Sequence, residues 1–320
     1  MQTQAVVIPE PGKVQLQDVA LNDPGPDDVI IKTAYTSISA GTERMLLAGQ
    51  MPHPMLALPV VPGYETVGRV VEVGTNVDAT MKDRWVYVGG ALCYDGVNAA
   101  WGGQSATLFT AANRVVPLDG VDPKQGVLLA LSATALHGVD VLGEAAQERV
   151  LVIGQGPVGQ LAARIAKSRG AWVAVADRSA SRLTHAVADV VVNVDETPLT
   201  DAIDEPVTAI IEASGSMPAL TAALPKLANG GTILLLGYYQ TLDLPYMPLF
   251  LKEARLLTAK EWSPGDLNHC RDMIARGELD VSSLLTHDFP ITEVASAYET
   301  ALNDIDCLKL VLDWTTVAAN

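Results

Sequence analysis

The feature that most constrains this chain is a glycine motif, Gly154-Gln155-Gly156-Pro157-Val158-Gly159. An apolar run at residues 149–153 precedes it, and a helix-compatible segment at 160–168 follows. In such a motif the first glycine permits a tight turn, the second lets backbone N–H groups approach a pyrophosphate, and the third allows close packing of helix on strand. The spacing therefore predicts a strand, a turn and a helix whose N-terminus binds a dinucleotide. An ordinary strand-to-helix turn is the alternative. The predicted cofactor-binding residues in this motif are Gly154, Gly156, Pro157, Val158 and Gly159.

An acidic residue follows the motif at the distance expected for a ribose contact. Asp177 stands 18 residues after Gly159, at the end of the next apolar run. A carboxylate there accepts hydrogen bonds from the adenosine ribose and repels a 2′-phosphate, so NAD is favoured over NADP. Arg178 and Arg182 follow closely and provide the opposite possibility, because arginine can hold that phosphate. We predict Asp177 and Arg178 as cofactor-binding residues.

Small residues also end two later apolar runs. These are Glu212-Ala213-Ser214-Gly215 and Leu236-Gly237-Tyr238-Tyr239. At the carboxyl edge of a doubly wound parallel sheet, such strand ends face the bound dinucleotide. Ser214, Gly237 and Tyr238 are therefore further candidates for cofactor binding, and ordinary turn chemistry is the alternative reading of the same residues.

The hydrophobic pattern changes along the chain. The first part alternates apolar and polar residues between Pro and Gly turns, which is typical of antiparallel strands. From about residue 125 a helical stretch at 128–141 is followed by short apolar runs that alternate with helical segments, as in an α/β domain with a parallel sheet. After residue 262 the pattern predicts helices at 264–276 and 291–303 and apolar runs at 284–289 and 308–314, a tail expected to fold back onto the first lobe. The runs read as parallel strands are 150–153, 172–176, 190–194, 209–211 and 232–236.

Length, charge and cysteine content exclude several classes of protein. The 320 residues suffice for about two domains, and a net charge of −16 repels nucleic-acid backbones and anionic membrane surfaces. No apolar run approaches the roughly 18 residues that span a bilayer. The start of the chain lacks the pattern of a signal peptide, so a cytoplasmic protein is expected. Three cysteines without a C-x-x-C pair predict neither a disulfide framework nor a cysteine-rich zinc lobe.

In the order of its parts the chain resembles the medium-chain dehydrogenase/reductase superfamily. The resemblance covers nearly the whole chain and is carried by segments 28–32 and 62–74, the glycine motif and segment 286–290. It implies a Rossmann doubly wound parallel sheet inserted in a β-rich GroES-like catalytic domain. The implied boundaries are 1–122 with 263–320 for the catalytic domain, and 123–262 for the dinucleotide-binding domain. A homodimer is also expected from the resemblance.

A finer resemblance concerns the substrate. Segments 39–47, 250–256, 261–262 and 306–314 are similar to members of the superfamily that act in bacteriochlorophyll a synthesis. These members oxidise the 3-(1-hydroxyethyl) group of a chlorophyllide-type tetrapyrrole to 3-acetyl, and the resemblance implies the same NAD-dependent oxidation here.

The apolar segment 45–56 suits a wide, flat macrocycle because methionine side chains are polarizable and adaptable. Core packing or a subunit contact is the alternative for this segment. The predicted substrate-binding residues are Met45, Met51 and Met55, with Arg44 as a partner for the propionate of the pigment.

The chain departs from the zinc-dependent members of the superfamily. Those members carry a cysteine, a Gly-His-Glu and a second cysteine, at positions that correspond here to Ser39 or Ala40, Tyr64 and approximately Ala130. Serine, tyrosine and alanine are poor or impossible ligands for Zn²⁺. We therefore predict a dehydrogenase without a metal ion.

Without zinc, protein side chains have to accept the proton of the alcohol. Thr42 matches the Ser/Thr that relays the proton in the superfamily, Glu43 or His137 could accept a proton at neutral pH, and Tyr64 could donate a hydrogen bond to the carbonyl oxygen as it forms. Each also has a structural reading as a cap, a hydrogen-bond acceptor or a core residue. The catalytic candidates are Ser39, Thr42, Glu43, Tyr64, Glu65 and His137.

Two other functions remain open at this point. One is a zinc-free superfamily member that reduces quinones or activated C=C bonds with NADPH, against which Asp177 argues. The other is a non-catalytic dinucleotide-binding scaffold that has lost turnover together with its zinc ligands. Turnover and cofactor preference distinguish the three.

Overall fold

The computed structural model describes residues 1–52 and 57–316. The chain divides into two compact units, which we call unit 1 (Met1–Ala130 with Leu285–Asn320) and unit 2 (Leu131–Leu284). The sequence placed the second boundary at 262/263. In the structure residues 263–284 group with unit 2 because Arg164 ties this segment down, donating hydrogen bonds to the Asp280 carbonyl (2.6 Å) and the Ser283 hydroxyl (2.9 Å).

Unit 1 is rich in strands. Its described residues form one sheet in the order β7-β2-β1-β4-β8 and another in the order β10-β6-β5-β3-β18-β17, with β9 pairing to β3. Most neighbouring strands are antiparallel, as the alternating pattern predicted. The strands are β1 (Gln2–Glu10), β2 (Lys13–Leu21), β3 (Asp28–Ser37), β4 (Val60–Val61), β5 (Thr66–Val73), β6 (Trp85–Val88), β7 (Tyr94–Asp95), β8 (Asn98–Ala99), β9 (Thr107–Ala111), β10 (Val115–Pro117), β17 (Leu285–Pro290) and β18 (Lys309–Asp313); the helices are α1 (Ala40–Leu47) and α9 (Val294–Asn303).

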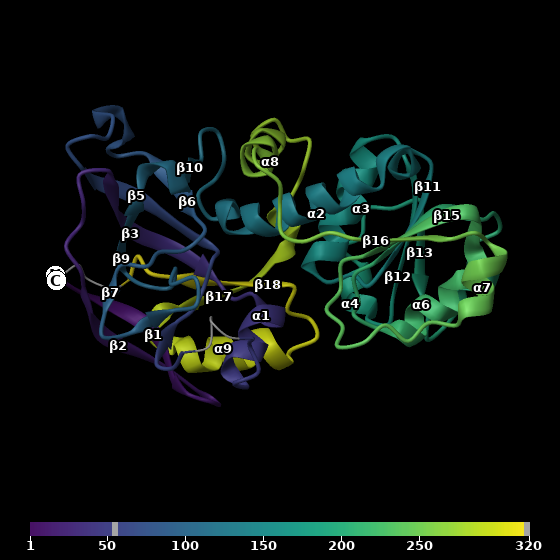
Figure 1. Ribbon diagram of the computed structural model, residues 1–320, viewed down its shortest axis with the longest axis horizontal. Coiled ribbons are helices and arrows are strands. Elements are labelled where there is room, and N and C mark those ends of the chain that lie inside the picture. Colours follow the sequence, from purple (N-terminus) through teal and green to yellow (C-terminus); the bar gives the residue numbers. More distant parts are fainter. Residues whose placement is uncertain (53–56, 317–320) are drawn as a thin grey trace. The chain divides into compact units, whose positions relative to one another are not determined.

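The C-terminal segment completes unit 1, which confirms the predicted return of the tail. β18 pairs antiparallel with β3, Val311 opposite Ser37, and β17 pairs with β18. In Figure 1 these yellow elements lie among the purple and blue strands of the first lobe. Trp314 fixes the end of β18 because its indole N–H donates a hydrogen bond to the Thr36 hydroxyl (2.8 Å) inside the core.

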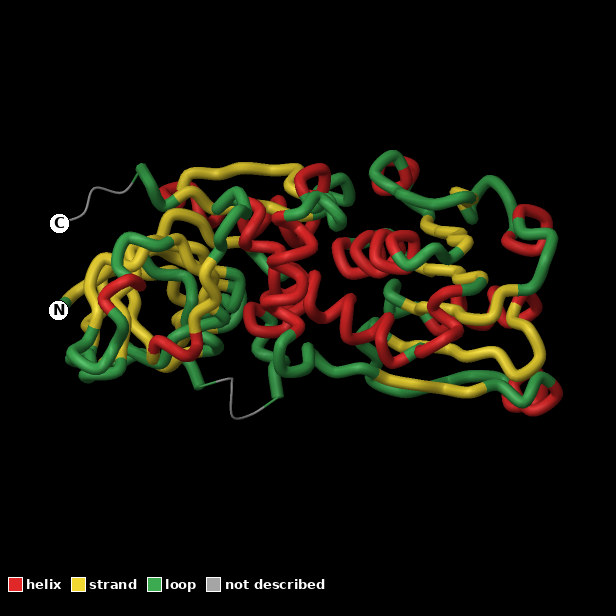
Figure 2. Tube along the Cα trace, turned by 90° about the horizontal axis from the view of Figure 1, so that it is seen from above, coloured by secondary structure: helices red, strands yellow, loops and turns green. Residues whose placement is uncertain are grey.

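Unit 2, whose residues are all described, contains a parallel sheet in the order β13-β12-β11-β14-β15-β16. Helices lie on either side of it (Figures 1 and 2). The predicted doubly wound α/β fold is thus confirmed. The strands are β11 (Arg149–Ile153), β12 (Trp172–Asp177), β13 (Val190–Asn193), β14 (Val207–Glu212), β15 (Leu227–Leu235) and β16 (Arg255–Thr258), and the helices are α2 (Leu129–Val141, which begins in unit 1), α3 (Pro157–Ser168), α4 (Ala180–Leu183), α5 (Leu199–Ala202), α6 (Met217–Ala223), α7 (Tyr246–Leu251) and α8 (Asp266–Ala275).

Local sequence explains most of these elements. The strands in the middle of the unit 2 sheet are continuous apolar runs because both of their faces are buried. The last strand, β16, did not stand out in the sequence: it lies at the edge of the sheet, and Arg255 and Leu256 on it are exposed. Within residues 1–52 and 57–316, no helix has both the length and the apolar character needed to cross a membrane.

Candidate active site

The glycine motif forms the turn between β11 and α3. Gly154 has φ of +90°, a conformation that favours glycine, and a Cβ on it would lie 2.7 Å from the Cα of Ser214. A Cβ on Gly159 would lie only 1.9 Å from the Gly154 carbonyl oxygen, so the helix packs directly on the turn. Pro157 occupies the first turn of α3, where its missing N–H costs nothing. Half-buried Val158 follows it.

Gly156 differs from the other two glycines of the motif. It is the N-cap of α3 with an extended backbone, and a Cβ on it would meet no protein atom within 4 Å. No protein contact therefore requires a glycine at this position. A glycine here does allow a ligand to approach the helix N-terminus closely.

These two environments lead to opposite expectations for alanine substitutions. We expect Gly156→Ala to leave the thermal midpoint nearly unchanged and to weaken dinucleotide binding about tenfold or more, since the new methyl group occupies the ligand's path. Gly159→Ala should instead destabilise the fold by about 1–3 kcal/mol, because the backbone has to move. Thermal melts and binding titrations of both variants check this, and equal effects of the two on stability would contradict it.

Asp177 ends β12 beside the glycine motif. One carboxylate oxygen accepts the N–H of Gln155 (2.6 Å) and the other accepts the N–H of Ser179 (2.8 Å). The backbone thus fixes this carboxylate at the carboxyl edge of the sheet, where a ribose contact is expected. Its neighbour Arg178 is exposed and pairs with Asp195.

The ends of β14 and β15 meet next to the glycine turn. The buried carboxylate of Glu212 accepts hydrogen bonds from the N–H and hydroxyl of Ser214 and from the N–H of Gly215 (3.1 Å). A Cβ on Gly237 would lie 2.7 Å from the Gly215 nitrogen. The structure therefore brings the predicted residues Ser214 and Gly237 to one edge of the sheet, with Tyr238 next to them and 63% exposed.

In unit 1, three of the predicted catalytic residues form a hydroxyl cluster. The Ser39 Oγ lies 2.5 Å and the Thr42 Oγ1 3.4 Å from the Tyr64 Oη. Ser39 is the N-cap of α1 and Thr42 lies in its first turn, so the helix start sets their positions. The Tyr64 ring packs edge-on against Trp101, with centroids 5.2 Å apart. Burial, with the nearby Glu65 charge, raises the pKa of the Tyr64 phenol, which is therefore neutral and able to donate a hydrogen bond at neutral pH.

Glu43 lies buried behind this cluster. Its carboxylate accepts hydrogen bonds from the Ser39 N–H (3.2 Å) and from the Gln104 amide (3.2 Å to each oxygen). Tyr298 donates a hydrogen bond to the other end of the Gln104 amide (3.0 Å). Burial raises the pKa of Glu43 from 4.5 to about 7, against the opposing effect of the nearby Tyr298 hydroxyl. Such a carboxyl can take up and release a proton near neutrality.

Glu65 forms a buried ion pair. The Lys309 Nζ lies 2.6 Å from Glu65 Oε2, and the exposed fractions of the two side chains are 1% and 0%. Ser37 also donates its hydroxyl to Glu65, and Lys309 donates to the Ile38 carbonyl (3.3 Å). The other carboxylate oxygen of Glu65 has no hydrogen-bond partner among the described residues. Glu65 is thus a fixed charge directly beside Tyr64.

The remaining catalytic candidate, His137, belongs to unit 2. Its Nδ1 lies 3.1 Å from the Ser263 hydroxyl and 4.0 Å from an Asp266 carboxylate oxygen. The Ser263 hydroxyl thus gives Nδ1 a hydrogen-bond partner within unit 2, and a catalytic role for His137 stays a prediction.

The predicted substrate residues have different surroundings. Met51 is buried in a core cluster with Leu46 and Val60, and Met45 packs against the same cluster. Arg44 is exposed and its guanidinium donates to the Leu302 carbonyl. Met55 lies outside the described residues.

The residues at the positions of the zinc ligands do not fit a zinc ion. Ser39 and Tyr64 are hydrogen-bonded to each other through neutral hydroxyl groups, and Ala130 has no ligand atom. In the part of the chain that the structure describes, no three His, Cys, Asp or Glu side chains are grouped to hold a metal ion.

Sequence reasoning missed several residues of these sites. Gln104 and Lys309 contact the predicted carboxylates of Glu43 and Glu65 but lie 61 and 244 positions away from them in the chain. Tyr298 bonds to Gln104 from 194 positions away. Glu212 was noted only as the end of an apolar run. The structure shows that its carboxylate also holds the loop at Ser214 by accepting the Ser214 N–H. Lys309, within the apolar run at 308–314, was the available signal for a buried charge.

Comparison with known families covers both units. A model of the alcohol dehydrogenase GroES-like domain matches residues 25–120, and a model of the zinc-binding dehydrogenase family matches residues 157–275. The chain is 37% identical over 318 residues to 2-desacetyl-2-hydroxyethyl bacteriochlorophyllide A dehydrogenase of Rhodobacter capsulatus, covering 98% of this chain and 99% of the relative.

Solved structures show the same fold. A protein of Escherichia coli CFT073 described as a short chain alcohol dehydrogenase, complexed with NADH, superposes with a TM-score of 0.86 at 22% identity, covering 98% of this chain and 99% of that one. A putative zinc-binding dehydrogenase of Sinorhizobium meliloti 1021, bound to NADP, gives a TM-score of 0.84 at 22% identity and the same coverage. With these matches over both units, the chain belongs to the medium-chain dehydrogenase/reductase superfamily.

Proposed function

We propose that this protein oxidises the 3-(1-hydroxyethyl) group of a (bacterio)chlorophyllide a-type tetrapyrrole to 3-acetyl, with NAD as the oxidant, in bacteriochlorophyll a synthesis. The observation that carries the proposal is the 37% identity, over nearly the full length of both chains, to a hydroxyethyl bacteriochlorophyllide dehydrogenase. In this reaction the alcohol loses a hydride and a proton, and the products are the ketone, NADH and H⁺.

Unit 2 supplies the dinucleotide site of this proposal. The glycine turn and the N-terminus of α3 hold the pyrophosphate, and Asp177 accepts hydrogen bonds from the adenosine ribose. Ser214, Gly237 and Tyr238 border the same edge of the sheet on the other side of β11. A dinucleotide bound there would supply the acceptor for the hydride of the carbinol carbon.

Unit 1 supplies the groups that handle the proton. Tyr64, as a neutral phenol, donates a hydrogen bond to the substrate oxygen and stabilises the charge that develops there. Ser39 and Thr42 relay the proton through hydroxyl groups that contact Tyr64. We assign proton acceptance to Glu43, whose pKa is about 7. The last transfer needs a bridging water because Glu43 contacts Ser39 through its backbone N–H.

The substrate side of the proposal rests on Arg44 and Met45. Arg44 is exposed and offers a charge for the propionate of the pigment, while half-buried Met45 offers an adaptable apolar contact. Met51 supports this surface from the core beneath it.

We also propose that the reaction proceeds without a metal ion, since the residues at the ligand positions do not suit zinc. Metal analysis of purified, active protein tests this. Less than 0.1 equivalent of zinc, on the order expected for adventitious metal, supports the proposal; stoichiometric zinc that is lost together with activity overturns it.

One assay separates this function from the alternatives. The protein is mixed with NAD and hydroxyethyl bacteriochlorophyllide a, and the pigment spectrum is followed together with NADH. A red shift of the long-wavelength band with one NADH per pigment supports the dehydrogenase. NADPH oxidation by a quinone or enone without pigment turnover would favour the reductase, and cofactor binding without any turnover would favour the scaffold.

A further inference from the structure

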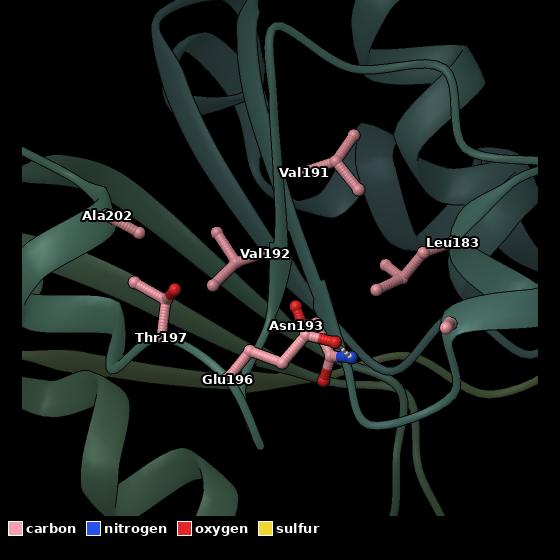
Figure 3. Close-up of a pocket in the computed structure, with 8 residues that line it drawn as sticks. Leu183, Val191, Val192, Asn193, Glu196, Thr197 and Ala202 are labelled. Carbon is pink, nitrogen blue, oxygen red and sulfur yellow. Dashed lines mark hydrogen bonds between the residues drawn. The ribbon is translucent and has the colours of Figure 1, made fainter.

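The turn after β13 places a second carboxylate next to the predicted ribose site. β12 and β13 pair in parallel with Asp177 opposite Asn193, so both strands end at the same edge of the sheet. The Asn193 side chain accepts the N–H of Asp195 (3.1 Å) and donates to Glu196 (2.9 Å), as the dashed line in Figure 3 marks. Asp195 is therefore held on an ordered turn beside the end of β12.

Asp195 forms an ion pair with the arginine that follows Asp177. The Arg178 Nε lies 3.1 and 3.2 Å from the two carboxylate oxygens of Asp195. Asp177 itself is occupied by the backbone N–H groups of Gln155 and Ser179. At this edge of the sheet the Asp177 carboxylate thus lies at the predicted ribose site, whereas the Asp195 carboxylate binds Arg178.

This arrangement bears on which dinucleotide fits. A 2′-phosphate on the adenosine ribose needs a cation, and an arginine next to the acidic position is the residue type that supplies it. The fold alone does not decide, since one solved neighbour holds NADH and another holds NADP. A hollow of about 290 Å³ lies beside β13, and it does not supply a cation for a 2′-phosphate. The residues that line it include Glu196 but no basic side chain (Figure 3).

We propose that Asp195 is a specificity-determining residue, which disfavours a 2′-phosphate by binding Arg178 and by adding a second negative charge beside Asp177. The inference rests on the proposed use of NAD. Both partners are exposed, with 79% of the Arg178 and 53% of the Asp195 side chain accessible. Because an exposed ion pair contributes little to stability, removal of Asp195 should release Arg178 without disturbing the fold.

The experiment measures the dissociation constants of NAD⁺ and NADP⁺ for the purified full chain by calorimetry at one fixed ionic strength. We expect Asp195→Asn to tighten NADP⁺ binding about five- to tenfold and to change NAD⁺ binding by no more than about twofold. Adding Arg178→Met to this variant should remove the gain. Asp201→Asn is the matched control, because it deletes one exposed negative charge of unit 2, on a carboxylate that accepts a hydrogen bond from the Thr200 hydroxyl (3.1 Å).

The outcomes are distinct. A NADP⁺-to-NAD⁺ ratio that does not change in Asp195→Asn, or that changes equally in Asp201→Asn, overturns the role of Asp195. A gain that survives Arg178→Met overturns the part assigned to the ion pair. If the unmodified protein binds NADP⁺ as tightly as NAD⁺, the proposed cofactor preference fails, whereas the role of Asp195 is still judged by the difference between the two asparagine variants.

Discussion

Replacing Tyr64 by phenylalanine should lower kcat for oxidation of the hydroxyethyl pigment by about two orders of magnitude, the usual effect of losing one preorganised donor at a developing charge. The variant keeps the ring that packs against Trp101 and loses only the hydroxyl that contacts Ser39 and Thr42. Because the dinucleotide site belongs to unit 2, the affinity for NAD should stay the same. Single-turnover kinetics at saturating NAD measure the effect on the chemical step.

Tyr94→Phe provides the control for a lost buried hydroxyl. Tyr94 donates to the Gly102 carbonyl (2.6 Å) and lies 2.8 Å from the Ser105 hydroxyl, and no catalytic role is proposed for it. We expect this variant to lose about 1 kcal/mol of stability while kcat stays within about threefold of the unmodified value. A Tyr64→Phe variant that retains more than about one third of kcat would refute the role of Tyr64.

The second large effect concerns stability. Lys309→Met should destabilise unit 1 by about 3–5 kcal/mol, since it leaves the Glu65 carboxylate buried without its counter-charge. The Ser37 hydroxyl remains as a hydrogen-bond partner but carries no charge. Methionine is an unbranched side chain of similar size to lysine. The loss of stability should therefore come mainly from the lost charge and not from lost volume. Urea unfolding, followed by tryptophan fluorescence to which the buried Trp314 of unit 1 contributes, measures the loss.

The double variant Lys309→Met/Glu65→Gln tests the physical reason. A neutral amide next to the methionine removes the unpaired charge, so the double variant should recover more than half of the lost stability. Lys309→Arg, which keeps the charge, should lose less than Lys309→Met. If the free energy of unfolding of Lys309→Met is within about 1 kcal/mol of that of the unmodified protein, the Glu65–Lys309 ion pair does not stabilise unit 1 as proposed.

The fold could be predicted where local pattern and burial coincide. The apolar runs at 150–153 and 172–176 became β11 and β12 because buried parallel strands need continuous apolar sequence. β16 escaped prediction because an edge strand is half exposed. Residues 263–284 were assigned to the first lobe, but contacts of Arg164 attach them to unit 2, and no local pattern reports such a contact.

For the candidate sites, prediction from the sequence likewise fails where residues far apart in the chain come into contact. The glycine motif, Asp177 and the hydroxyls of residues 39–64 could be found in the sequence, because their chemistry depends on residue type and short spacing. The pairing of Glu65 with Lys309, 244 positions further along the chain, could not, because two buried charges meet only when β18 returns to β3. The Gln155 contact of Asp177 likewise depends on how β12 aligns with β11, and the Asp195 contact of Arg178 on how β12 aligns with β13. The sequence by itself thus determined which chemistry is present, whereas tertiary structure decided which charges compensate one another, since burial makes that compensation obligatory.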